Sequence, residues 1–328
     1  MCTALNIKTD TKCFFGRNMD LAYFFNQSPI IISKGYQYED KVTGEMLKTN
    51  KSIIGMGTII DNHPAMAEGM NEDGLACAGL NFARYAYFEP QATKGKINLA
   101  PYDFILWVLS YHSTTDEVEQ KISEIQLVDV PINSKIPVPT LHWMISDKHG
   151  KSIVVEKTKQ KITVHQNPVG VMTNDPTFDW HITNLNEYMN LNAHHPQPVT
   201  WGQKELKGLG IGIGTLGMPG DFASVSRFVR IAYVRSHMPK IKNDDEAISQ
   251  CFHMLDYVAM VKGGVITEEG LEDLTLYSSC MDQEKGIYYY KNYENNRINA
   301  IDMHKEQLNN GELKVFPYLT KQDINYQN

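Results

Sequence analysis

The sequence predicts an α+β protein, in which strands and helices occur in separate runs along the chain. Strand-like stretches cover residues 3–19 and 52–82, helix-like stretches cover 101–124, and strands return at 141–166. Two more helices and a last group of strands complete the chain. Because no alternating βαβ pattern occurs, helices that cover antiparallel sheets are favoured over a parallel sheet. No repeat or long linker divides the chain, so we expect one domain, residues 1–328.

The first half of the chain contains expected hairpins followed by expected helices. Residues 3–7 and 13–19 flank the polar turn TDTK. SIIGMGTII is rich in β-branched residues, and AMAEGMNEDGLACAGLNF indicates two strands around a turn at 71–74, where Gly74 supplies a positive φ. Pro101 begins the helix PYDFILWVLSYH, and residues 113–116 can cap a second helix, DEVEQKISEI.

The second half returns to strands and then adds longer helices. LHWMISD, KSIVVEKT and KITVHQ are expected strands, and TFDWHITNLNEYM is an expected helix after Pro176. Residues 196–220 are rich in glycine and predict a loop. SRFVRIAYVRSHM and DDEAISQCFHMLDYVAM have the apolar spacing of amphipathic helices. LTLYSSC and GIYYYKNYENN are expected strands, with aromatic residues that suit a half-buried sheet.

Composition and charge exclude several classes of protein. Hydrophobic residues make up 42% and charged residues 21% of the chain, which is normal for a globular protein. The net charge of −7 argues against a nucleic-acid partner, because binding to phosphates needs a basic face. No run of about 18 apolar residues predicts membrane insertion, and polar residues from Asn6 to Lys12 interrupt any signal-peptide pattern. We therefore expect a cytoplasmic protein.

The sequence contains no convincing metal or cofactor motif. The five cysteines are scattered and form no CxxC pair, so neither a zinc site nor a disulfide framework is indicated. GIGTLG (212–217) matches the dinucleotide fingerprint in form, but Pro219 follows it at once where a helix is required, so a loop is favoured. HExxH and GxSxG are absent. We expect no cofactor and no metal.

Cys2 is the residue that most directly indicates chemistry. Removal of Met1 would place its thiol on the same residue as a free α-amine, whose pKa of roughly 7.7–8.0 suits a proton shuttle. Antiparallel pairing would bring Arg17 and Asp20 near the start of the first strand. Arg17 could then favour the thiolate by charge, while Asp20 could accept a hydrogen bond from the α-amine. The alternative is an ordinary cysteine beside a surface ion pair.

The chain resembles the choloylglycine hydrolases, which comprise conjugated bile salt hydrolases and penicillin V acylases. MCTALNI, FGRNMD, NEDGLACAGLNF, VGVMTNDPTFDW and LGMPGDFASVSRFVR occur in the order seen in that family. The resemblance implies the N-terminal nucleophile hydrolase fold, an αββα four-layer sandwich of two antiparallel sheets between helix layers. It also implies a cytoplasmic enzyme without a cofactor, usually a homotetramer.

The same resemblance implies a set of catalytic residues. Cys2 matches the nucleophile, and Arg17 and Asp20 match the charged pair that flanks it. The remaining matches are two asparagines that help hold the oxyanion and the substrate amide, and an arginine that supports the site by charge: Asn81, Asn174 and Arg227. Asp175 departs from the serine or asparagine expected after Asn174. Its carboxylate could weaken the oxyanion donor, unless it points away and caps the following helix.

The substrate implied by the resemblance is a glycine- or taurine-conjugated bile salt, cut through a thioester on Cys2. Asn81 and FGRNMD favour the bile salt branch, whereas KGGVITEEG is closer to acylases, so penicillin V cleavage is expected as a weak side activity. A penicillin V acylase, or an inactive protein that binds amphipathic ligands, stays as an alternative. Six apolar residues are candidates for the steroid pocket, and each could equally be an ordinary core residue: Met19, Ile60, Ala67, Ile132, Ile136 and Leu141.

Overall fold

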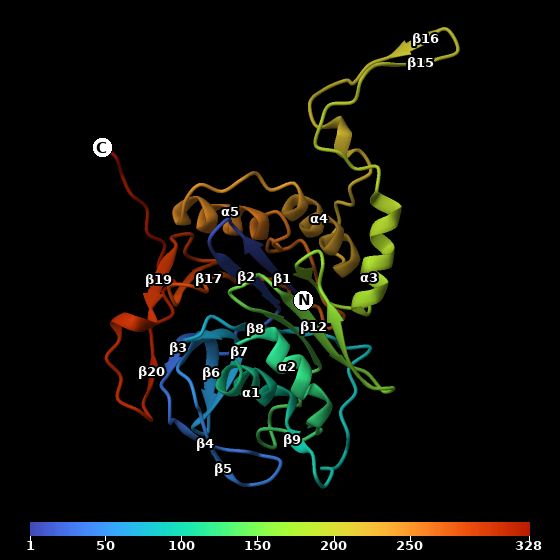
Figure 1. Ribbon diagram of the computed structural model, residues 1–328. Helices are drawn as coiled ribbons and strands as arrows, with labels where there is room; N and C mark the ends of the chain where they lie inside the picture. The colour runs from blue at the N-terminus through green and yellow to red at the C-terminus, as the bar shows by residue number, and fades with distance from the viewer.

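Two large antiparallel sheets lie face to face, with helices on both outer sides (Figure 1). The computed structural model describes residues 1–328. One sheet has six strands, in the order β14 (Val171–Met172), β1 (Cys2–Lys8), β2 (Cys13–Leu21), β17 (Leu274–Asp282), β18 (Ile287–Asn292) and β19 (Asn299–Asp302). The N-terminal hairpin therefore lies between strands from the middle and the end of the chain.

The other sheet has eight strands and is also antiparallel throughout. Its order is β13 (Ile162–Gln166), β12 (Ser152–Lys157), β11 (Leu141–Ser146), β8 (Ala76–Asn81), β7 (His63–Asn71), β6 (Ile53–Ile60), β3 (Ser28–Ile32) and β20 (Leu313–Val315). The turn between β7 and β8 forms as predicted, with Gly74 at a φ of +83°. A Cβ there would lie 2.2 Å from the carbonyl oxygen of Gln283, so both the backbone and the space require glycine.

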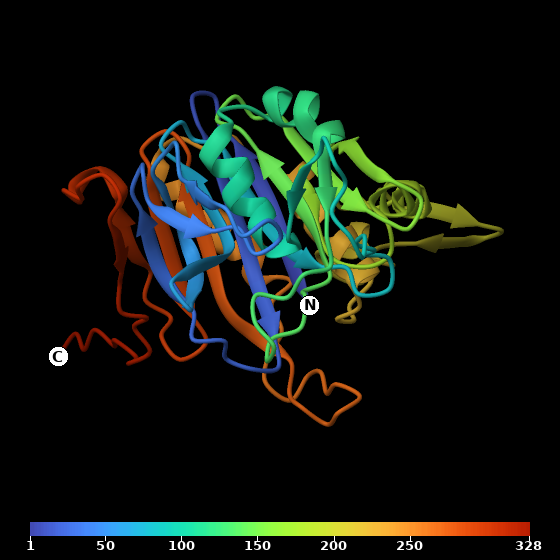
Figure 2. The same ribbon diagram turned by 90° about the horizontal axis from the view of Figure 1, so that it is seen from below.

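Helices cover the outer face of each sheet, which completes the αββα sandwich. The helices α4 (Ser224–Ser236) and α5 (Asp244–Asp256) pack on the six-stranded sheet, against β1, β14, β2 and β17. Gly16 on β2 allows α5 to approach, because a Cβ there would meet the Cys251 sulfur at 2.5 Å. The helix α1 (Phe104–Tyr111) packs on β7 and β8, and α2 (Thr115–Lys121) follows it, as the teal ribbons of Figure 2 show.

The remaining elements are short. The helix α3 (Phe178–Asn184) continues into a 3₁₀ turn, η3 (Leu185–Tyr188), where the sequence predicts one helix. Four more 3₁₀ turns occur at η1 (Pro101–Asp103), η2 (Ile122–Glu124), η4 (Ile213–Thr215) and η5 (Met303–Lys305). A small hairpin joins β4 (Gln37–Glu39) to β5 (Met46–Lys48). None of the helices is both long and apolar enough to cross a membrane.

Two sequence expectations need correction. The helix expected over DEVEQKISEI ends at Lys121, and residues 125–127 instead form β10 (Ile125–Leu127), which pairs in parallel with β9 (Ile97–Leu99). Residues 196–220 are not loop throughout, because they contain the hairpin of β15 (Val199–Trp201) and β16 (Lys204–Leu206). Gly202, at a φ of +59°, makes the tight turn of this hairpin, which extends far from the body of the protein (Figure 1).

Two large apolar clusters fill the sandwich. The larger has 36 buried residues and joins the two sheets to α4 and α5, with Phe15 and Tyr277 from one sheet against Ile54 and Met144 from the other. The second has 22 buried residues and lies between the eight-stranded sheet and α1. Cys2 belongs to the larger cluster, so the start of the chain is built into the core.

Candidate active site

Cys2 begins strand β1, and its buried thiol contacts an arginine. The β1–β2 register pairs Cys2 with Met19, and side-chain alternation puts Arg17 on the same face. The Nη2 atom of Arg17 donates to the Cys2 sulfur at 2.9 Å. Burial opposes the charge of Arg17, but the neighbouring Cys2 and Glu68 outweigh it and raise the pKa of Arg17. A guanidinium held charged beside a sulfur is the kind of environment that activates a thiol.

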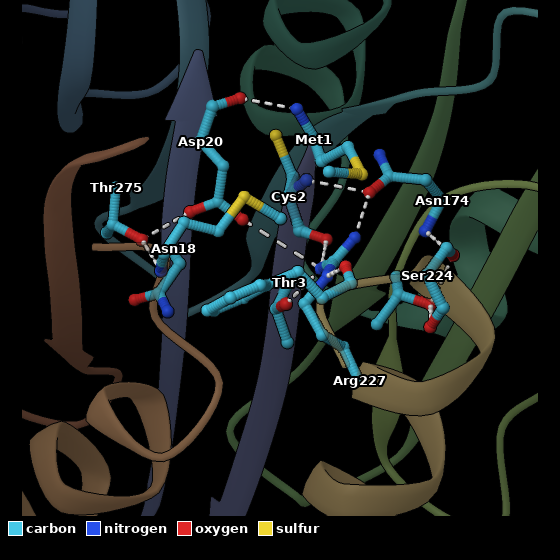
Figure 3. Close-up of polar contacts among 12 residues, drawn as sticks. Met1, Cys2, Thr3, Asn18, Asp20, Asn174, Ser224, Arg227 and Thr275 are labelled. Atoms are coloured by element: carbon cyan, nitrogen blue, oxygen red, sulfur yellow. Dashed lines mark hydrogen bonds and ion pairs between the residues drawn. The ribbon is translucent and has the colours of Figure 1, made fainter. Parts of the chain in front are cut away.

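The backbone nitrogen of Cys2 is held by Asn174, which follows β14 (Figure 3). The Oδ1 atom of Asn174 accepts from the Cys2 nitrogen at 2.7 Å and from Nη2 of Arg227 at 2.7 Å. Met1 precedes Cys2 here, so this nitrogen is an amide that stands in for the α-amine of a chain without Met1. The Nδ2 atom of Asn174 uses one N–H on the Asn81 carbonyl, at 2.8 Å. Its second N–H is left as a donor.

Arg227, on α4, holds the backbone at the start of β1. It is fully buried, and its Nη1 atom donates at 2.6 Å both to the Cys2 carbonyl and to Oγ1 of Thr3. Burial lowers the pKa of Arg227, while Asp20 and Cys2 act in the opposite direction. The second arginine of the site therefore positions the backbone of Cys2, whereas Arg17 contacts its sulfur.

Asp20 is fully buried on β2, and its carboxylate does not contact the Cys2 nitrogen. Its Oδ1 atom accepts from Oγ1 of Thr275 at 2.6 Å, and Oδ2 lies 3.8 Å from Arg227 without a hydrogen bond. Its backbone pairs with Met1, which donates to the Asp20 carbonyl at 2.6 Å. Burial raises the pKa of Asp20, against the opposing charges of Arg227 and the chain's amine. The sequence predicts a contact between Asp20 and the Cys2 nitrogen, but in this structure the Oδ1 atom of Asn174 makes that contact.

Asn81 ends β8 beside this group, and its side chain is exposed. Its Oδ1 atom accepts from Oγ1 of Thr140 at 2.9 Å. Its carbonyl is the acceptor that holds the Asn174 amide. The structure therefore brings Asn81 and Asn174 into direct contact, as an oxyanion site formed by both would require.

Asp175 does not cap the following helix. Thr177 occupies the N-cap position of α3 and makes no side-chain cap. The Oδ2 atom of Asp175 instead accepts from the Arg84 backbone nitrogen at 3.2 Å, while Oδ1 has no partner. Burial raises the pKa of Asp175, although the Arg84 N–H acts in the opposite direction. A carboxyl group therefore stays beside Asn174.

A buried polar network fixes the segment that carries Asn174. Ser224 accepts from the Asn174 nitrogen at 2.9 Å, and Nε2 of His181 donates to the Asn174 carbonyl at 2.9 Å. His142 contacts the Thr173 carbonyl through Nε2 at 2.9 Å. Burial lowers the pKa of His181 to about 4, so the imidazole that donates to the Asn174 carbonyl is the neutral one. Asn174 is thus restrained on both its backbone and its side chain.

A cavity of about 370 Å³ is lined by both asparagines and by Met1, the residue before Cys2; the Cys2 side chain itself is not part of its wall. Its walls come from the chain start, the end of β8 and the residues after it, the segment after β14, and the start of α4: Met1, Asn81, Ala83, Arg84, Asn174, Asp175, Ala223, Ser224 and Val225. A larger cavity, of about 570 Å³, lies between α1, α2 and the β4–β5 hairpin and shares no residue with this site. We place the chemistry at the smaller cavity because Asn81 and Asn174 line it.

The six apolar residues expected around the substrate are not gathered around this cavity. Met19 and Ala67 lie beside Arg17, which contacts the Met19 sulfur at 3.5 Å and the Ala67 carbonyl at 3.0 Å. Ile60 and Ile132 belong to a separate small apolar cluster.

The last two of these residues differ in their exposure. Leu141 pairs with Asn81 across β11 and β8 and packs partly into the second core. Ile136 is 39% exposed. A role in substrate binding stays a prediction for all six.

Sequence reasoning missed several polar residues of the site. Thr3 accepts a hydrogen bond from Arg227, and Thr275 donates one to Asp20. Ser224 accepts from the backbone nitrogen of Asn174. Glu68 is the fourth, a fully buried carboxylate that contacts Arg17 at 3.0 Å. Its signal was present, because Glu68 is the single Asp, Glu, Lys or Arg in the strand HPAMAEGMN, whose other polar residues, His63 and Asn71, stand at its two ends. The threonines and the serine carry no comparable signal.

A thiol at a strand start, a guanidinium on its sulfur and amide donors beside a cavity are suited to acyl transfer. Together with the αββα sandwich they define an amide hydrolase of the N-terminal nucleophile fold. The family model of the linear amide C–N hydrolases, choloylglycine hydrolase family, matches residues 2–316, and the chain belongs to this family. No group of three or more His, Cys, Asp or Glu residues is arranged to hold a metal ion.

Relatives within the family are similar over the full chain. A bile salt hydrolase/transferase of Clostridium perfringens is 49% identical, over 100% of both chains. A protein of the same name from Lactiplantibacillus plantarum is 36% identical over 97% of each chain. The crystal structure of a C2A mutant of the conjugated bile acid hydrolase from Clostridium perfringens superposes with a TM-score of 0.94, at 49% identity and full coverage of both chains. A penicillin V acylase from Agrobacterium tumefaciens shares the fold, with a TM-score of 0.74 at 23% identity over 96% of this chain and 90% of that one.

Proposed function

We propose that this protein hydrolyses the amide bond that joins a bile acid to glycine or taurine, with Cys2 as the nucleophile. Membership of the amide hydrolase family supports the reaction type. The full-length similarity to a protein named as a bile salt hydrolase/transferase, at 49% identity, supports the substrate class. The observation that carries the proposal is the pair of contacts on Cys2, from Arg17 to its sulfur at 2.9 Å and from its nitrogen to Asn174 at 2.7 Å.

The first half of the reaction forms a thioester. The Cys2 thiolate bonds to the amide carbonyl carbon, and the carbonyl oxygen takes the negative charge. We assign the second N–H of Asn174 and the neighbouring Asn81 as the donors to that oxygen, an interaction worth roughly 3 kcal/mol per donor. The C–N bond then breaks, the Cys2 α-ammonium gives its proton to the departing nitrogen, and glycine or taurine leaves.

The second half restores the enzyme. The α-amine, now neutral, takes a proton from a water molecule as the water attacks the thioester carbonyl. The C–S bond breaks, the free bile acid leaves, and the proton returns to the thiol. In both halves Asn174 holds the nitrogen of Cys2 through its side-chain oxygen, and the same side chain offers an N–H to the oxyanion. One residue therefore positions both the proton shuttle and the oxyanion donor.

The test measures free amino groups released from glycocholate, taurocholate and penicillin V, with Cys2→Ala as the control. Release from the two bile salts that disappears in the control is the expected result. Release mainly from penicillin V would keep the nucleophile and overturn the substrate. No release from any of the three would overturn the proposal.

We also propose Asn81 as the residue that favours bile salts over penicillin V. Its side chain lines the cavity and makes a hydrogen bond only with Thr140. A larger aromatic ring at this position would therefore extend into the cavity. Asn81→Tyr is expected to lower glycocholate turnover, whereas Thr140→Val serves as a control that removes the hydrogen bond without blocking the cavity. Equal turnover in Asn81→Tyr and the parent protein would contradict this assignment.

We further propose that Met1 is removed, because only then does Cys2 carry a free amine. Met1 lines the cavity and pairs with the backbone of Asp20, so its loss would both enlarge the cavity and free the end of β2. Intact-mass measurement of active protein is expected to show the chain without Met1. Full activity with Met1 retained would contradict the proposed proton shuttle.

We propose that the protein acts in the cytoplasm as a homotetramer of single-domain chains, residues 1–328. The support in the structure is the projecting segment around β15 and β16, whose exposed apolar side chains would pack on a second copy: Met189, Val199, Trp201, Leu209, Ile211 and Leu216. Light scattering is expected to give four times the chain mass of 37.3 kDa. Trp201→Ser, whose indole is 74% exposed, is expected to shift that mass downward, and an unchanged mass would remove this segment from the interface.

A further inference from the structure

Glu68 is a buried carboxylate that lies directly behind the arginine of the Cys2 site. It comes from β7 of the eight-stranded sheet and is 0% exposed. All its hydrogen-bond donors come from the facing six-stranded sheet, on β2, β17 and β18. Burying a carboxylate is costly unless it is paired and hydrogen-bonded, so a group of this kind at the sheet interface needs a reason.

The hydrogen bonds of Glu68 are complete. Its Oε2 atom accepts from Nη1 of Arg17 at 3.0 Å and from the Tyr277 hydroxyl at 2.8 Å. Its Oε1 atom accepts from the Tyr288 hydroxyl at 2.6 Å and from the Ser279 hydroxyl at 3.2 Å. Two donors on each oxygen match the acceptor capacity of an ionised carboxylate. The pocket is therefore built to hold a negative charge in one place.

That charge is one member of a three-part chain that ends at the nucleophile. Arg17 points Nη1 at Glu68 and Nη2 at the Cys2 sulfur. Because the guanidinium is planar and rigid, the position of the Glu68 carboxylate determines where Nη2 lies relative to the sulfur. The Ala67 carbonyl, next to Glu68 on β7, also accepts from Nη1 at 3.0 Å. The Nε atom of Arg17 has no partner, so Glu68 and Ala67 supply the contacts that hold the fork.

We propose that Glu68 is a positioning residue that holds Arg17 against the Cys2 sulfur and, by its charge, limits how strongly Arg17 stabilises the thiolate. A thiolate that is stabilised less is a stronger nucleophile, because intrinsic reactivity falls as the thiol becomes more acidic. Glu68 therefore keeps the sulfur reactive as well as ionisable. The inference rests on Cys2 being the nucleophile of the proposed function.

Other charged groups surround Cys2 and act alongside Glu68. The charged groups come from β2, α4 and the segment before β17: Arg17, Asp20, Arg227, Asp273 and the amine of the chain; Tyr277, on β17, adds a neutral hydroxyl. Glu68→Gln removes the charge of Glu68 and leaves all of these groups in place. Its amide oxygen can still accept from Arg17, while its NH₂ faces the hydroxyl oxygens of Tyr288 and Ser279, which can accept.

The experiment follows the rate of Cys2 alkylation by iodoacetamide against pH, read by mass spectrometry on the N-terminal peptide. With Glu68→Gln we expect the midpoint of the profile to move to lower pH by roughly one unit, because an opposing charge has gone. We expect the plateau rate at high pH to fall on the order of threefold, since reactivity follows acidity with a slope near one half. Asp147→Asn is the matched control, because Asp147 is also buried, accepts four hydrogen bonds and does not contact Arg17.

Each outcome decides the inference. A Glu68→Gln profile shifted to lower pH, beside an unshifted profile in Asp147→Asn, supports it. A Glu68→Gln profile that is unmoved or shifted to higher pH, or the same shift in both variants, overturns it. Should Glu68→Gln fail to fold, Glu68→Asp replaces it. That variant keeps the charge, but its shorter side chain no longer holds Arg17 against the sulfur, so the midpoint is then expected to rise, and an unmoved midpoint overturns the inference. Alkylation needs no substrate, so a failure of the bile salt proposal leaves this test intact.

Discussion

The buried imidazole of His181 is expected to make the free energy of unfolding depend on pH. His181 lies on α3 and is 2% exposed, its Nε2 atom donates to the Asn174 carbonyl at 2.9 Å, and its ring stacks on Phe228 with centroids 4.4 Å apart. Its Nδ1 atom has no partner. Protonation would therefore bury a charge and an N–H without an acceptor, and burial lowers the pKa of His181 from 6.5 to about 4.

The magnitude and the sign follow from linkage. The unfolded chain takes up a proton at His181 near pH 6.5 and the folded chain only near pH 4, so between these values the unfolded state binds more protons. The stability that His181 contributes is therefore present above pH 6.5 and is lost as the pH falls toward 4. A difference of roughly 2.5 pKa units corresponds to a loss of about 3 kcal/mol in the free energy of unfolding.

Urea unfolding of the parent protein and of His181→Gln, at several pH values from 7 to 4, tests this. Glutamine can still donate to the Asn174 carbonyl, but it does not titrate. The fall in unfolding free energy between pH 7 and pH 4 is expected to be about 3 kcal/mol smaller in the variant. His253→Gln, at an exposed position on α5, is the control and should follow the parent. Equal pH dependence in the parent and in His181→Gln would refute the reasoning.

Three further substitutions have defined outcomes. Asn174→Ala removes the acceptor on the nucleophile's nitrogen and one oxyanion donor, so kcat for glycocholate is expected to fall on the order of a hundredfold; a fall below tenfold would contradict its role. Asp175→Asn keeps an acceptor for the Arg84 nitrogen but removes a charge beside the oxyanion, so kcat is expected to rise roughly fivefold, equivalent to about 1 kcal/mol, and a decrease would show that the carboxylate helps. Thr114→Ala removes the N-cap that accepts from the Glu117 nitrogen of α2; urea unfolding is expected to show a loss of about 1 kcal/mol with activity unchanged.

Local patterns predicted the part of the site that comes from neighbouring segments. The hairpin of β1 and β2 is readable because both strands are apolar and the polar turn TDTK separates them, and the register then places Arg17 within reach of Cys2. The turn at Gly74 and the N-cap at Thr114 are likewise local, because each depends on residues within four positions along the chain. These features were predicted from the residues and are found in the structure.

The rest of the site depends on strand order, which local patterns do not contain. Glu68 reaches Arg17 only because the two sheets face each other, and Thr275 reaches Asp20 only because β17 pairs with β2 across about 250 residues of chain. No periodicity within a segment specifies such a pairing. Asp175 was readable as a departure, but its contact with the Arg84 nitrogen depends on a loop that lies 91 residues away.

The geometry around Met1 indicates how removal of that residue would act on the site. With Met1 present, Arg17 already contacts the Cys2 sulfur and Asn174 already holds the Cys2 nitrogen. Met1 adds a ladder pair with Asp20, from its nitrogen to the Asp20 carbonyl at 2.6 Å and from the Asp20 nitrogen to its own carbonyl at 2.9 Å. Its removal therefore breaks no contact of the Cys2 sulfur and frees one donor and one acceptor on β2 beside the new amine. Because buried backbone groups need partners, the amine of Cys2 or the amide of a bound substrate is the natural replacement at that strand end.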